Sequence, residues 1–353
     1  MKIGIVGGNS RVGTELSVLL DGAGHDVVPV VRNRLSGALF ERAGFEVRVA
    51  DVANAGDARE TLAGLDVVVI AAHADVESTS AKRAKQINER LVANSVSYSP
   101  ADATPVFFSS IAAYGDAIYS EIQTPAIKVK QKRRGERILQ ERCDETGKAG
   151  YALRLGHVLG PLQLWTAELE AAIQGRDVLS VPANADTEAN VLHTVTLADA
   201  IGRCGREVVE PGVHNCVDEP QWTWREVIEY YAPASTEVDF EGPSRGTDRT
   251  KMNLVGTATT ALEPLHGKLL PLFEYLPETA FHYLKNNYLR KTTASEITSI
   301  RARRTLELKI CHLDPIPGPN LPGLPETRHR LEENHPIEDV FAPVDYPGVV
   351  MKS

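Results

Sequence analysis

The chain has 353 residues, of which 42% are hydrophobic and 24% charged, the proportions of an ordinary soluble globular protein. Its formal net charge of −9 argues against general binding to nucleic acid, and no stretch approaches the roughly 18 consecutive apolar residues that a membrane helix requires. The length exceeds what one hydrophobic core usually fills, so we expect two lobes or two domains.

The cysteines indicate a reducing compartment. Cys143, Cys204, Cys216 and Cys311 lie far apart and form no Cys-x-x-Cys pair. This spacing predicts reduced thiols in a cytoplasmic protein, and not a disulfide framework or a zinc site. No group of His, Cys, Asp and Glu has the spacing of another metal site, so we expect no metal.

Residues 1–155 alternate short apolar runs with amphipathic stretches, which is the pattern of a parallel sheet with helices on both faces. The uninterrupted apolar run Val67–Ile70 predicts a strand at the centre of this sheet, whereas residues 45–50 alternate apolar with charged side chains and predict a half-exposed strand. We therefore expect a Rossmann-type, doubly wound α/β domain over residues 1–160. Its strands are expected at 2–6, 26–31, 45–50, 66–71, 105–109 and 151–155, and two of its helices at 12–22 and 80–94.

A smaller substrate lobe of mixed α/β structure is expected over residues 161–310, and part of its sheet is free to return to the first domain. Five prolines within 315–325 exclude a helix or a central strand there, so residues 311–353 are expected to form an extended proline-rich arm. The arm lies either across the protein's own surface or on a second subunit of a homodimer. Helices are expected near 164–175, 197–209, 223–232, 278–290 and 294–307, and short strands at 178–181 and 213–217.

A glycine-rich turn joins the first strand to the first helix. Glycines at such a turn let the backbone approach a pyrophosphate, whose charge is met by unpaired amides and by the positive end of the helix dipole. Ser10 stands in the middle glycine's place of a Gly-x-x-Gly-x-x-Gly pattern; its hydroxyl can donate to a phosphate, but a positive φ would strain it. The alternative is that the glycines serve only tight packing. The residues predicted to hold a dinucleotide are Gly7, Asn9, Ser10, Arg11, Val12 and Gly13.

The second strand ends about twenty residues after the glycine turn, where a contact to the ribose is expected. Arg32 occupies that position, and Arg34 follows it closely. A guanidinium favours the 2′-phosphate of NADP, whereas NAD requires an acidic partner for its free 2′-hydroxyl. We therefore expect NADP(H) in preference to NAD(H). The alternative is that Arg32 is a solvated loop residue.

Several segments resemble the short-chain dehydrogenase/reductase superfamily, in the same order along the chain. Residues 24–32 resemble the second strand of its atypical members, including the NmrA-like group. Residues 109–116, 153–161 and 193–200 resemble segments of its extended, NAD-dependent epimerase/dehydratase-like branch. The likeness spans residues 1–235 and does not cover the rest. It implies contacts to the cofactor from the adenine-binding pair Asp51 and Val52 and from the turn Ala71, Ala72 and His73.

The same resemblance implies a catalytic Tyr-x-x-x-Lys pair, in which the tyrosine exchanges a proton with the substrate while hydride moves to or from the nicotinamide. Counting back from Glu136 places the lysine at Lys132 and a second lysine, Lys128, at the tyrosine's position. Two ammonium groups on one helix face lower each other's pKa, so a desolvated lysine is a candidate proton carrier. Tyr119, in the preceding loop, is the alternative acid. By resemblance, Ser110 orients the substrate carbonyl and Asn88 supports the lysine through water.

Tyr114 and His157 are predicted to face the substrate. The superfamily usually has a tyrosine at the position of Tyr114, which favours a structural role for it. His157 and His73 both follow a strand at its carboxyl end, where ligands bind in open parallel sheets, although an isolated histidine is more often a hydrogen-bonded wall residue. Residues 128–137 include six Lys or Arg, which favours either an anion site or, more often, a solvated helix face.

Together these features predict an NADP(H)-dependent oxidoreductase or epimerase/dehydratase-like enzyme with an altered tyrosine position. Its substrate is expected to be a small polar or biosynthetic metabolite between the two lobes, and neither nucleic acid nor membrane is expected as a partner. Two alternatives stay open. One is a cofactor-binding sensor without redox turnover, and the other is a non-redox enzyme that performs elimination or cyclisation on the same scaffold.

Overall fold

The computed structural model describes residues 1–74, 79–117, 126–173, 178–181, 185–240 and 316–332. The expected helices at 278–290 and 294–307 lie outside these residues. Among the described residues no helix is long and apolar enough to cross a membrane, and no three His, Cys, Asp or Glu side chains gather as they would around a metal ion.

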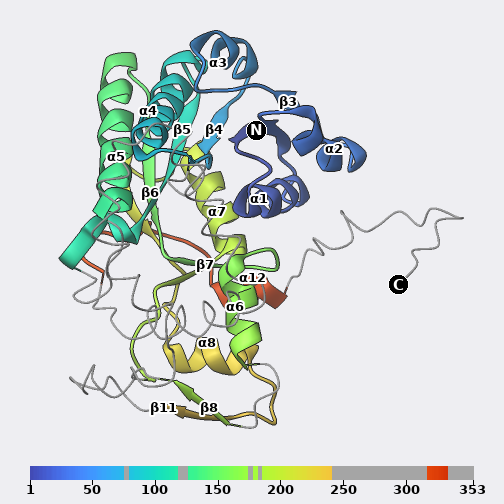
Figure 1. The fold of residues 1–353 in the computed structure, drawn as a ribbon, viewed down its shortest axis with the longest axis vertical. Coiled ribbons are helices and arrows are strands. Elements are labelled where there is room, and N and C mark those ends of the chain that lie inside the picture. The colour runs from blue at the N-terminus through green and yellow to red at the C-terminus, as the bar shows by residue number, and fades with distance from the viewer. Residues whose placement is uncertain (75–78, 118–125, 174–177, 182–184, 241–315, 333–353) are drawn as a thin grey trace, which may run out of the picture.

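Seven parallel strands form the main sheet (Figure 1), in the order β10-β6-β5-β4-β1-β2-β3. The apolar β4 lies at its centre with all four residues buried, as its sequence predicts. Sequential helices cover both faces, which confirms the Rossmann-type doubly wound α/β fold. The strands are β1 (Lys2–Val6), β2 (Asp26–Val31), β3 (Arg48–Val49), β4 (Val67–Ile70), β5 (Thr104–Ser110), β6 (Tyr151–Leu155) and β10 (Gly212–Cys216).

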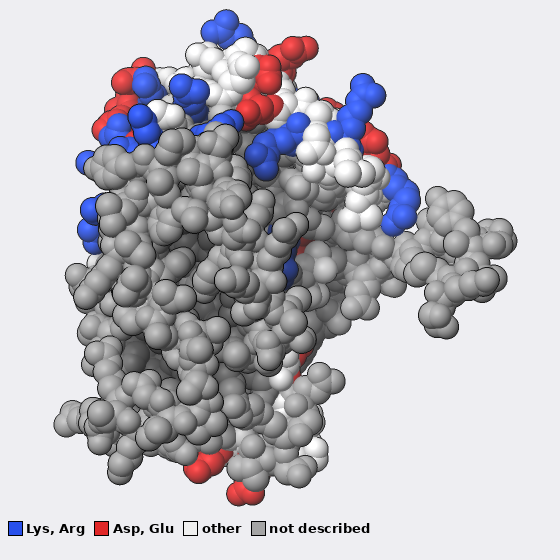
Figure 2. Space-filling model, viewed as in Figure 1, with Lys and Arg blue, Asp and Glu red and all other residues white. Residues whose placement is uncertain are grey.

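The two faces of the sheet bury separate cores. Helices α1 and α7 pack on one face, and α3, α4 and α5 pack on the other. The charged side chains around α3 and α4 alternate in sign over the part of the surface that Figure 2 shows and the structure describes. These helices are α1 (Arg11–Gly22), α2 (Arg34–Arg42), α3 (Ala55–Thr61), α4 (Ala81–Tyr98), α5 (Ala126–Thr146) and α7 (Thr194–Gly205), and a 3₁₀ helix, η1 (Ile111–Ala117), follows β5.

A third, smaller core belongs to the second lobe. Trp165, Trp222 and Trp224 are buried in it with aliphatic side chains from the short strands. A capping box between Thr223 and Glu226 starts the helix α8. The elements of this lobe are α6 (Leu164–Ile173), α8 (Trp224–Tyr231), the parallel pair β7 (His157–Leu159) and β9 (Val191–His193), and the parallel pair β8 (Val178–Val181) and β11 (Glu237–Phe240).

The second half of the chain also completes the main sheet. Strand β10 pairs with β6, and α7 covers the same face as α1. The strand expected at 213–217 therefore belongs to the sheet of the first domain, because it pairs with the open edge of β6.

Residues 316–332, within the proline-rich arm, pack against this same chain. Asn320 forms a parallel bridge with Asn215 of β10, and Leu321 and Leu324 are buried in the core beside α7. The segment ends in the short helix α12 (Thr327–Glu332), next to α7. Of the two expected positions for the arm, this segment takes the one on the protein's own surface.

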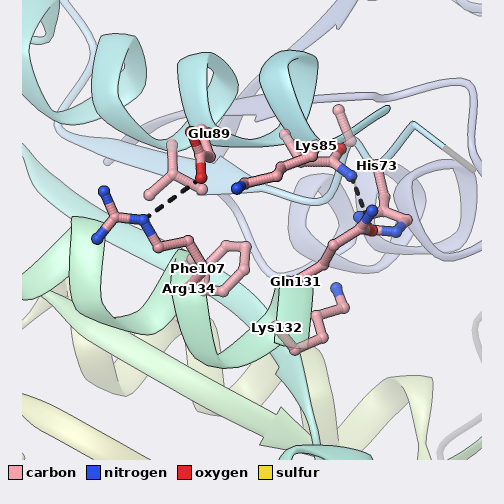
Figure 3. A pocket seen from close by; sticks show the side chains of 11 residues that line it. His73, Lys85, Glu89, Phe107, Gln131, Lys132 and Arg134 are labelled. Atoms are coloured by element: carbon pink, nitrogen blue, oxygen red, sulfur yellow. Dashed lines mark hydrogen bonds and ion pairs between the residues drawn. The ribbon is translucent and has the colours of Figure 1, made fainter. Parts of the chain in front are cut away.

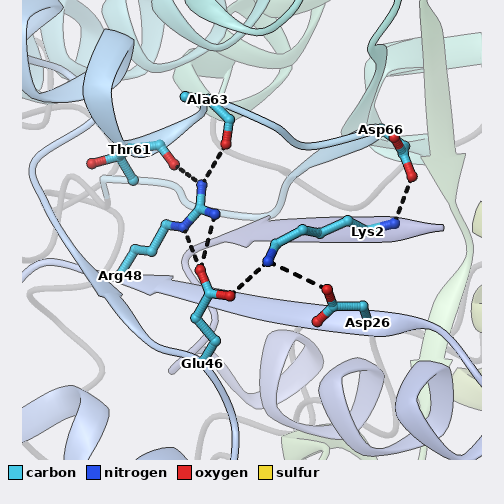
Figure 4. Close-up of polar contacts among 7 residues, drawn as sticks. All are labelled: Lys2, Asp26, Glu46, Arg48, Thr61, Ala63 and Asp66. Carbon is cyan, nitrogen blue, oxygen red and sulfur yellow. Dashed lines mark hydrogen bonds and ion pairs between the residues drawn. The ribbon is translucent and has the colours of Figure 1, made fainter.

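Strand β3 is shorter than the expected strand at 45–50, because side chains hold much of that segment. Glu46 accepts from Lys2 Nζ at 2.6 Å and from Arg48 Nε at 2.9 Å (Figure 4). Arg48 in turn donates to the carbonyls of Thr61 and Ala63. The hydrogen bond from Lys2 holds the pKa of Glu46 below its ordinary value. Only two residues pair with β2, so β3 is a minimal edge strand.

Candidate functional site

The glycine turn lies where the carboxyl ends of β1, β2 and β4 meet. Gly7 has a φ of +86°, and a Cβ on it would stand 2.8 Å from the Cα of Ala72. Gly13 lies equally close to the turn, since a Cβ there would stand 2.5 Å from the carbonyl oxygen of Gly7. Only glycine fits both positions. Tight packing therefore accounts for these two glycines, and it also brings the start of α1 up to the sheet.

Ser10 is accommodated without strain. Its φ is −71°, and its side chain caps α1 by accepting from the amide of Gly13 at 3.0 Å. Within the described residues, the amides of Arg11 and Val12 at the start of the helix have no acceptor. Unpaired amides and the positive end of the helix dipole are the features that bind a pyrophosphate.

Arg32 and Arg34 both lie exposed at the carboxyl end of β2. Among the residues that the structure describes, neither guanidinium has a carboxylate partner. Asn33, between them, caps α2 by accepting from the amide of Ser36. The end of β2 therefore presents two cationic side chains and no acid beside the glycine turn.

The predicted adenine pair lies at the edge of a groove. Val52 is buried, and its carbonyl accepts from Asn94 Nδ2 at 2.8 Å, which fixes the loop after β3 to α4. Asp51 is exposed, and it lines a groove of about 590 Å³ together with Ile87 and Arg90 of α4. A groove with an apolar wall and a carboxylate is suited to a nucleobase with an exocyclic amine.

Ala71 and Ala72 follow β4, and both of their amides donate to the carbonyl of Val6. Asn88 of α4 holds the next segment with two hydrogen bonds, accepting from the amide of Ala74 at 2.7 Å and donating to its carbonyl at 3.0 Å. It also donates to Gln131 of α5 at 3.3 Å. Asn88 thus joins the turn after β4 to the helix that carries the predicted catalytic lysine.

Lys132 lies beside this turn in a small pocket between α4 and α5 (Figure 3). Its Nζ donates to the carbonyl of Phe108 on β5 at 2.7 Å and lies 5.3 Å from the centre of the Phe107 ring. Both contacts stabilise the ammonium form. Figure 3 places His73 near Gln131 in the same pocket.

The two candidates for the proton donor lie partly or wholly outside the described residues. Lys128 is one turn before Lys132 in α5, which puts the two lysines on one face of the helix, but its side chain lies outside the described part. Tyr119 also lies outside the described residues. Ser110 ends β5, and its hydroxyl oxygen accepts from the amide of Ala112 at 3.2 Å.

Tyr114 and His157, predicted to face the substrate, have partners within the protein. The Tyr114 hydroxyl donates to Asn215 Oδ1 at 2.8 Å, and the Arg154 guanidinium lies 4.3 Å from its ring centre. His157 packs its ring 5.0 Å from that of Trp165 in the core of the smaller lobe. Their substrate contacts stay a prediction.

The basic run 128–137 divides between interior contacts and solvent. Arg133 donates to the carbonyls of Ala113 and Tyr114, and Arg134 pairs with Glu89 at 3.4 Å, whereas Lys130 and Arg137 are exposed. The run is therefore only in part a solvated helix face.

Sequence reasoning missed a partly buried ion pair between α5 and β6. Glu136 receives two hydrogen bonds from Arg154, both 2.8 Å long, and a third from Ser109 at 2.6 Å. A glutamate inside a basic run was the available signal, but its partner is eighteen residues away on another element.

A second missed residue is Glu15, which is completely buried in α1. It accepts from the amide of Leu162 and from Gln163 Nε2, both in the loop that follows β7. Burial raises the pKa of Glu15, and hydrogen bonds from Thr194, Gln163 and Leu162 oppose that rise. These hydrogen bonds therefore fasten α1 to the smaller lobe.

Solved structures with similar folds come from nucleotide-sugar enzymes, although identity is too low to show more than the fold. UDP-N-acetylglucosamine 4-epimerase from Bacillus cereus is 18% identical, with a TM-score of 0.52, and the match covers 78% of this chain and 100% of that one. The UDP-Glc/GlcNAc 4-epimerase of Campylobacter jejuni is 16% identical, with a TM-score of 0.52 and coverage of 70% and 88%. No curated protein matches the chain.

The family assignment comes from the first half of the sequence. Residues 3–178 match the model of the family described as "NAD dependent epimerase/dehydratase family". This range contains the glycine turn, the Asp51 loop, Asn88, Ser110 and Lys132, in the geometry described above. Through residues 3–178 the chain belongs to the NAD dependent epimerase/dehydratase family.

Proposed function

We propose that this chain is a nicotinamide-dependent enzyme of the epimerase/dehydratase or oxidoreductase type, acting on a small polar metabolite held between its two lobes. The observation that carries the proposal is the start of α1, where Gly7 and Gly13 bring unpaired helix amides to the carboxyl ends of the central strands. The family match over residues 3–178 supports it.

The preferred coenzyme under this proposal is NADP(H). Arg32 and Arg34 stand at the end of β2, where a free 2′-hydroxyl would need an acid and a 2′-phosphate is met by a guanidinium. The family's description names NAD, so the preference is specific to this chain. Affinities for NADPH and NADH measured by fluorescence titration test it, in the wild type and in Arg32→Asp.

Arg42→Asp is the matched control, because Arg42 lies in the last turn of α2, away from the carboxyl end of β2, and its substitution makes the same charge change. The expected result is a wild-type preference for NADPH that Arg32→Asp reverses and Arg42→Asp keeps. A wild type that prefers NADH would overturn the assignment of Arg32.

The other roles in catalysis are assigned to residues around β5. When bound, a nicotinamide supplies or accepts hydride. Lys132, held against the carbonyl of Phe108, provides a fixed positive charge at the bottom of the site, and Asn88 fixes the neighbouring turn. Ser110 has a hydroxyl able to orient a carbonyl. The proton donor is assigned to Lys128 at the tyrosine's position, with Tyr119 as the alternative.

Turnover tests these roles. NADPH oxidation is measured with a panel of carbonyl compounds, and epimerisation with nucleotide sugars, which include UDP-N-acetylglucosamine because the Bacillus cereus neighbour is named for it. Lys132→Ala, Lys128→Ala and Tyr119→Phe are compared with the wild type. Loss of turnover by about a hundredfold or more in Lys132→Ala and in one of the other two variants is expected, the scale of a lost general acid.

A cofactor-binding sensor is the second candidate, because a lysine occupies the position of the catalytic tyrosine. Tight coenzyme binding without turnover over the whole panel would support the sensor and overturn the enzyme. A product formed with no net change in the coenzyme and insensitive to its redox state would instead indicate elimination or cyclisation.

A further inference from the structure

Residues 316–332, here called the strap, cross from the open edge of the main sheet to the smaller lobe. At one end, Asn215 of β10 donates its amide to the carbonyl of Pro319 at 2.9 Å, and Leu321 donates back to Asn215 at 2.8 Å. Leu321 and Leu324 are then buried beside α7. The strap therefore extends the main sheet past β10 by one bridge and adds to its core.

At its other end the strap is fastened by polar contacts to α7 and α8. Thr327 shares a buried hydrogen bond with Thr196 at 2.9 Å, and Arg330 donates to Asp199 at 2.9 Å. Arg328 pairs with Glu226, the capping-box residue of α8, and lies 4.9 Å from the centre of the Trp222 ring. Both lobes are thus held by one segment of 17 residues.

The first end of the strap also contacts the loop that carries Ser110. Tyr114, four residues after Ser110, donates its hydroxyl to Asn215 Oδ1. The side-chain amide of Asn215 points to the strap, with acceptors at Pro317, Gly318 and Asn320 between 3.3 and 3.4 Å away. A single buried amide therefore links residues 110–117 to the strap; this segment, the last residue of β5 and the 3₁₀ helix η1, is here called the Ser110 loop.

The rest of the Ser110 loop is held by elements of the active site. Arg133, next to Lys132 in α5, donates to the carbonyls of Ala113 and Tyr114. Arg154 covers the Tyr114 ring and is itself fixed by Glu136. The Tyr114 hydroxyl is the one polar group of this side chain, and Asn215 Oδ1 accepts its hydrogen bond.

We propose that the strap is a positioning element for the Ser110 loop and that it acts through Asn215. The proposal rests on the proposed function, in which Ser110 meets the substrate. The end of the strap that meets β10 is separated from the nucleotide turn, because β6, β5 and β4 lie between β10 and β1. Loosening the strap is therefore expected to lower turnover while coenzyme affinity is kept.

Two glycines of the strap provide a matched pair of variants. Gly318 has a φ of +97°, and a Cβ on it would stand 2.6 Å from the Tyr114 hydroxyl. Gly323 has a φ of +71°, and its Cβ would meet only the far end of the flexible Arg203 side chain. Gly318→Ala and Gly323→Ala both place a Cβ on a backbone of positive φ, but only the first disturbs Tyr114.

Hydrogen–deuterium exchange and kinetics are measured on both variants of the full chain. In Gly318→Ala, exchange of residues 111–117 is expected to rise about fivefold, the equivalent of one hydrogen bond, and kcat to fall by a similar factor. In Gly323→Ala, the exchange of residues 111–117 and kcat are both expected to stay within about twofold of the wild-type values. Coenzyme affinity is expected to stay at the wild-type value in both. Tyr114→Phe, which removes only the hydroxyl, is expected to reproduce the exchange result if Gly318→Ala does not fold.

If residues 111–117 exchange at the wild-type rate in both glycine variants and in Tyr114→Phe, the proposed link between the strap and the Ser110 loop is overturned. Faster exchange with unchanged kcat would overturn its positioning role. A wild type that binds no nicotinamide coenzyme refutes the proposed function instead, and the exchange comparison still decides whether the strap holds the loop.

Discussion

Ser10 shows how one side chain can replace the conformational freedom of a glycine. Its Oγ accepts from Gly13 and its amide donates to the carbonyl of Gly7 at 2.9 Å, so it closes the nucleotide turn from both sides. The φ of −71° is open to any residue. The serine therefore adds a helix cap at a position where glycine would supply only flexibility.

This cap leads to a prediction on stability. Ser10→Ala is expected to lower the free energy of unfolding by about 1 kcal/mol, the usual cost of a lost N-cap, whereas Ser10→Gly is expected to cost only a few tenths. Urea denaturation followed by circular dichroism measures both. Equal losses in the two variants would mean that the hydrogen bond to Gly13 contributes nothing to stability.

The positions of residues that belong to a local motif were predictable, whereas their roles stay a prediction. The glycine turn joins β1 to α1, and Asn88 and Lys132 lie on α4 and α5 beside the turn after β4 and the end of β5. The pairing of Glu136 with Arg154 was not predictable, because it joins α5 to β6 and no local pattern signals it. Long-range pairs of this kind need the packed sheet before they exist.

At the scale of elements, apolar runs predicted the central strands closely and the edges less well. Strand β4 is continuous and buried, so its composition alone defines it. Strand β3 is limited by its one partner and by the side chains of Glu46 and Arg48, which composition does not reveal. The strap was predicted as an arm because prolines exclude regular structure, but its docking site depends on the open edge of β10.

Burial of two leucines predicts how firmly the strap is docked. Leu321 is 2% exposed, and Leu321→Ala is expected to destabilise the protein by roughly 2–5 kcal/mol, the range for a buried leucine. Leu35→Ala is the control, because Leu35 is 88% exposed on α2 and is expected to cost less than about 0.5 kcal/mol. Urea midpoints test this pair, and similar values would show that the strap adds nothing to the core.

At the scale of the whole molecule, the two lobes are joined by the strap and by Glu15. Glu15 lies in α1, one turn beyond the glycine turn, and its partners Leu162 and Gln163 immediately precede α6. A buried carboxyl whose hydrogen bonds cross from one lobe to the other couples the nucleotide helix to the wall of the substrate lobe. Its protonation state therefore affects how the lobes are held.

The pH dependence of stability tests this coupling. Burial raises the folded-state pKa of Glu15 above its ordinary value of 4.5, so the folded state binds the proton more tightly than the unfolded chain. The contribution of Glu15 to stability is then complete below pH 4.5 and declines as the pH rises through the folded-state pKa. Glu15→Gln keeps an acceptor for Leu162 without the charge, and its unfolding free energy is expected to decline less than that of the wild type over this range.

Glu226→Gln is a control of opposite sign. The backbone amide of Thr223 and then the Arg328 side chain lower the folded-state pKa of Glu226, so its contribution is present above pH 4.5 and is lost as the pH falls through the lowered value. Urea unfolding from pH 3 to 8 distinguishes the two. If the unfolding free energies of Glu15→Gln and of the wild type change with pH in parallel, the Glu15 carboxyl titrates as in the unfolded chain. In that case α1 is held to the smaller lobe by packing and by neutral hydrogen bonds alone.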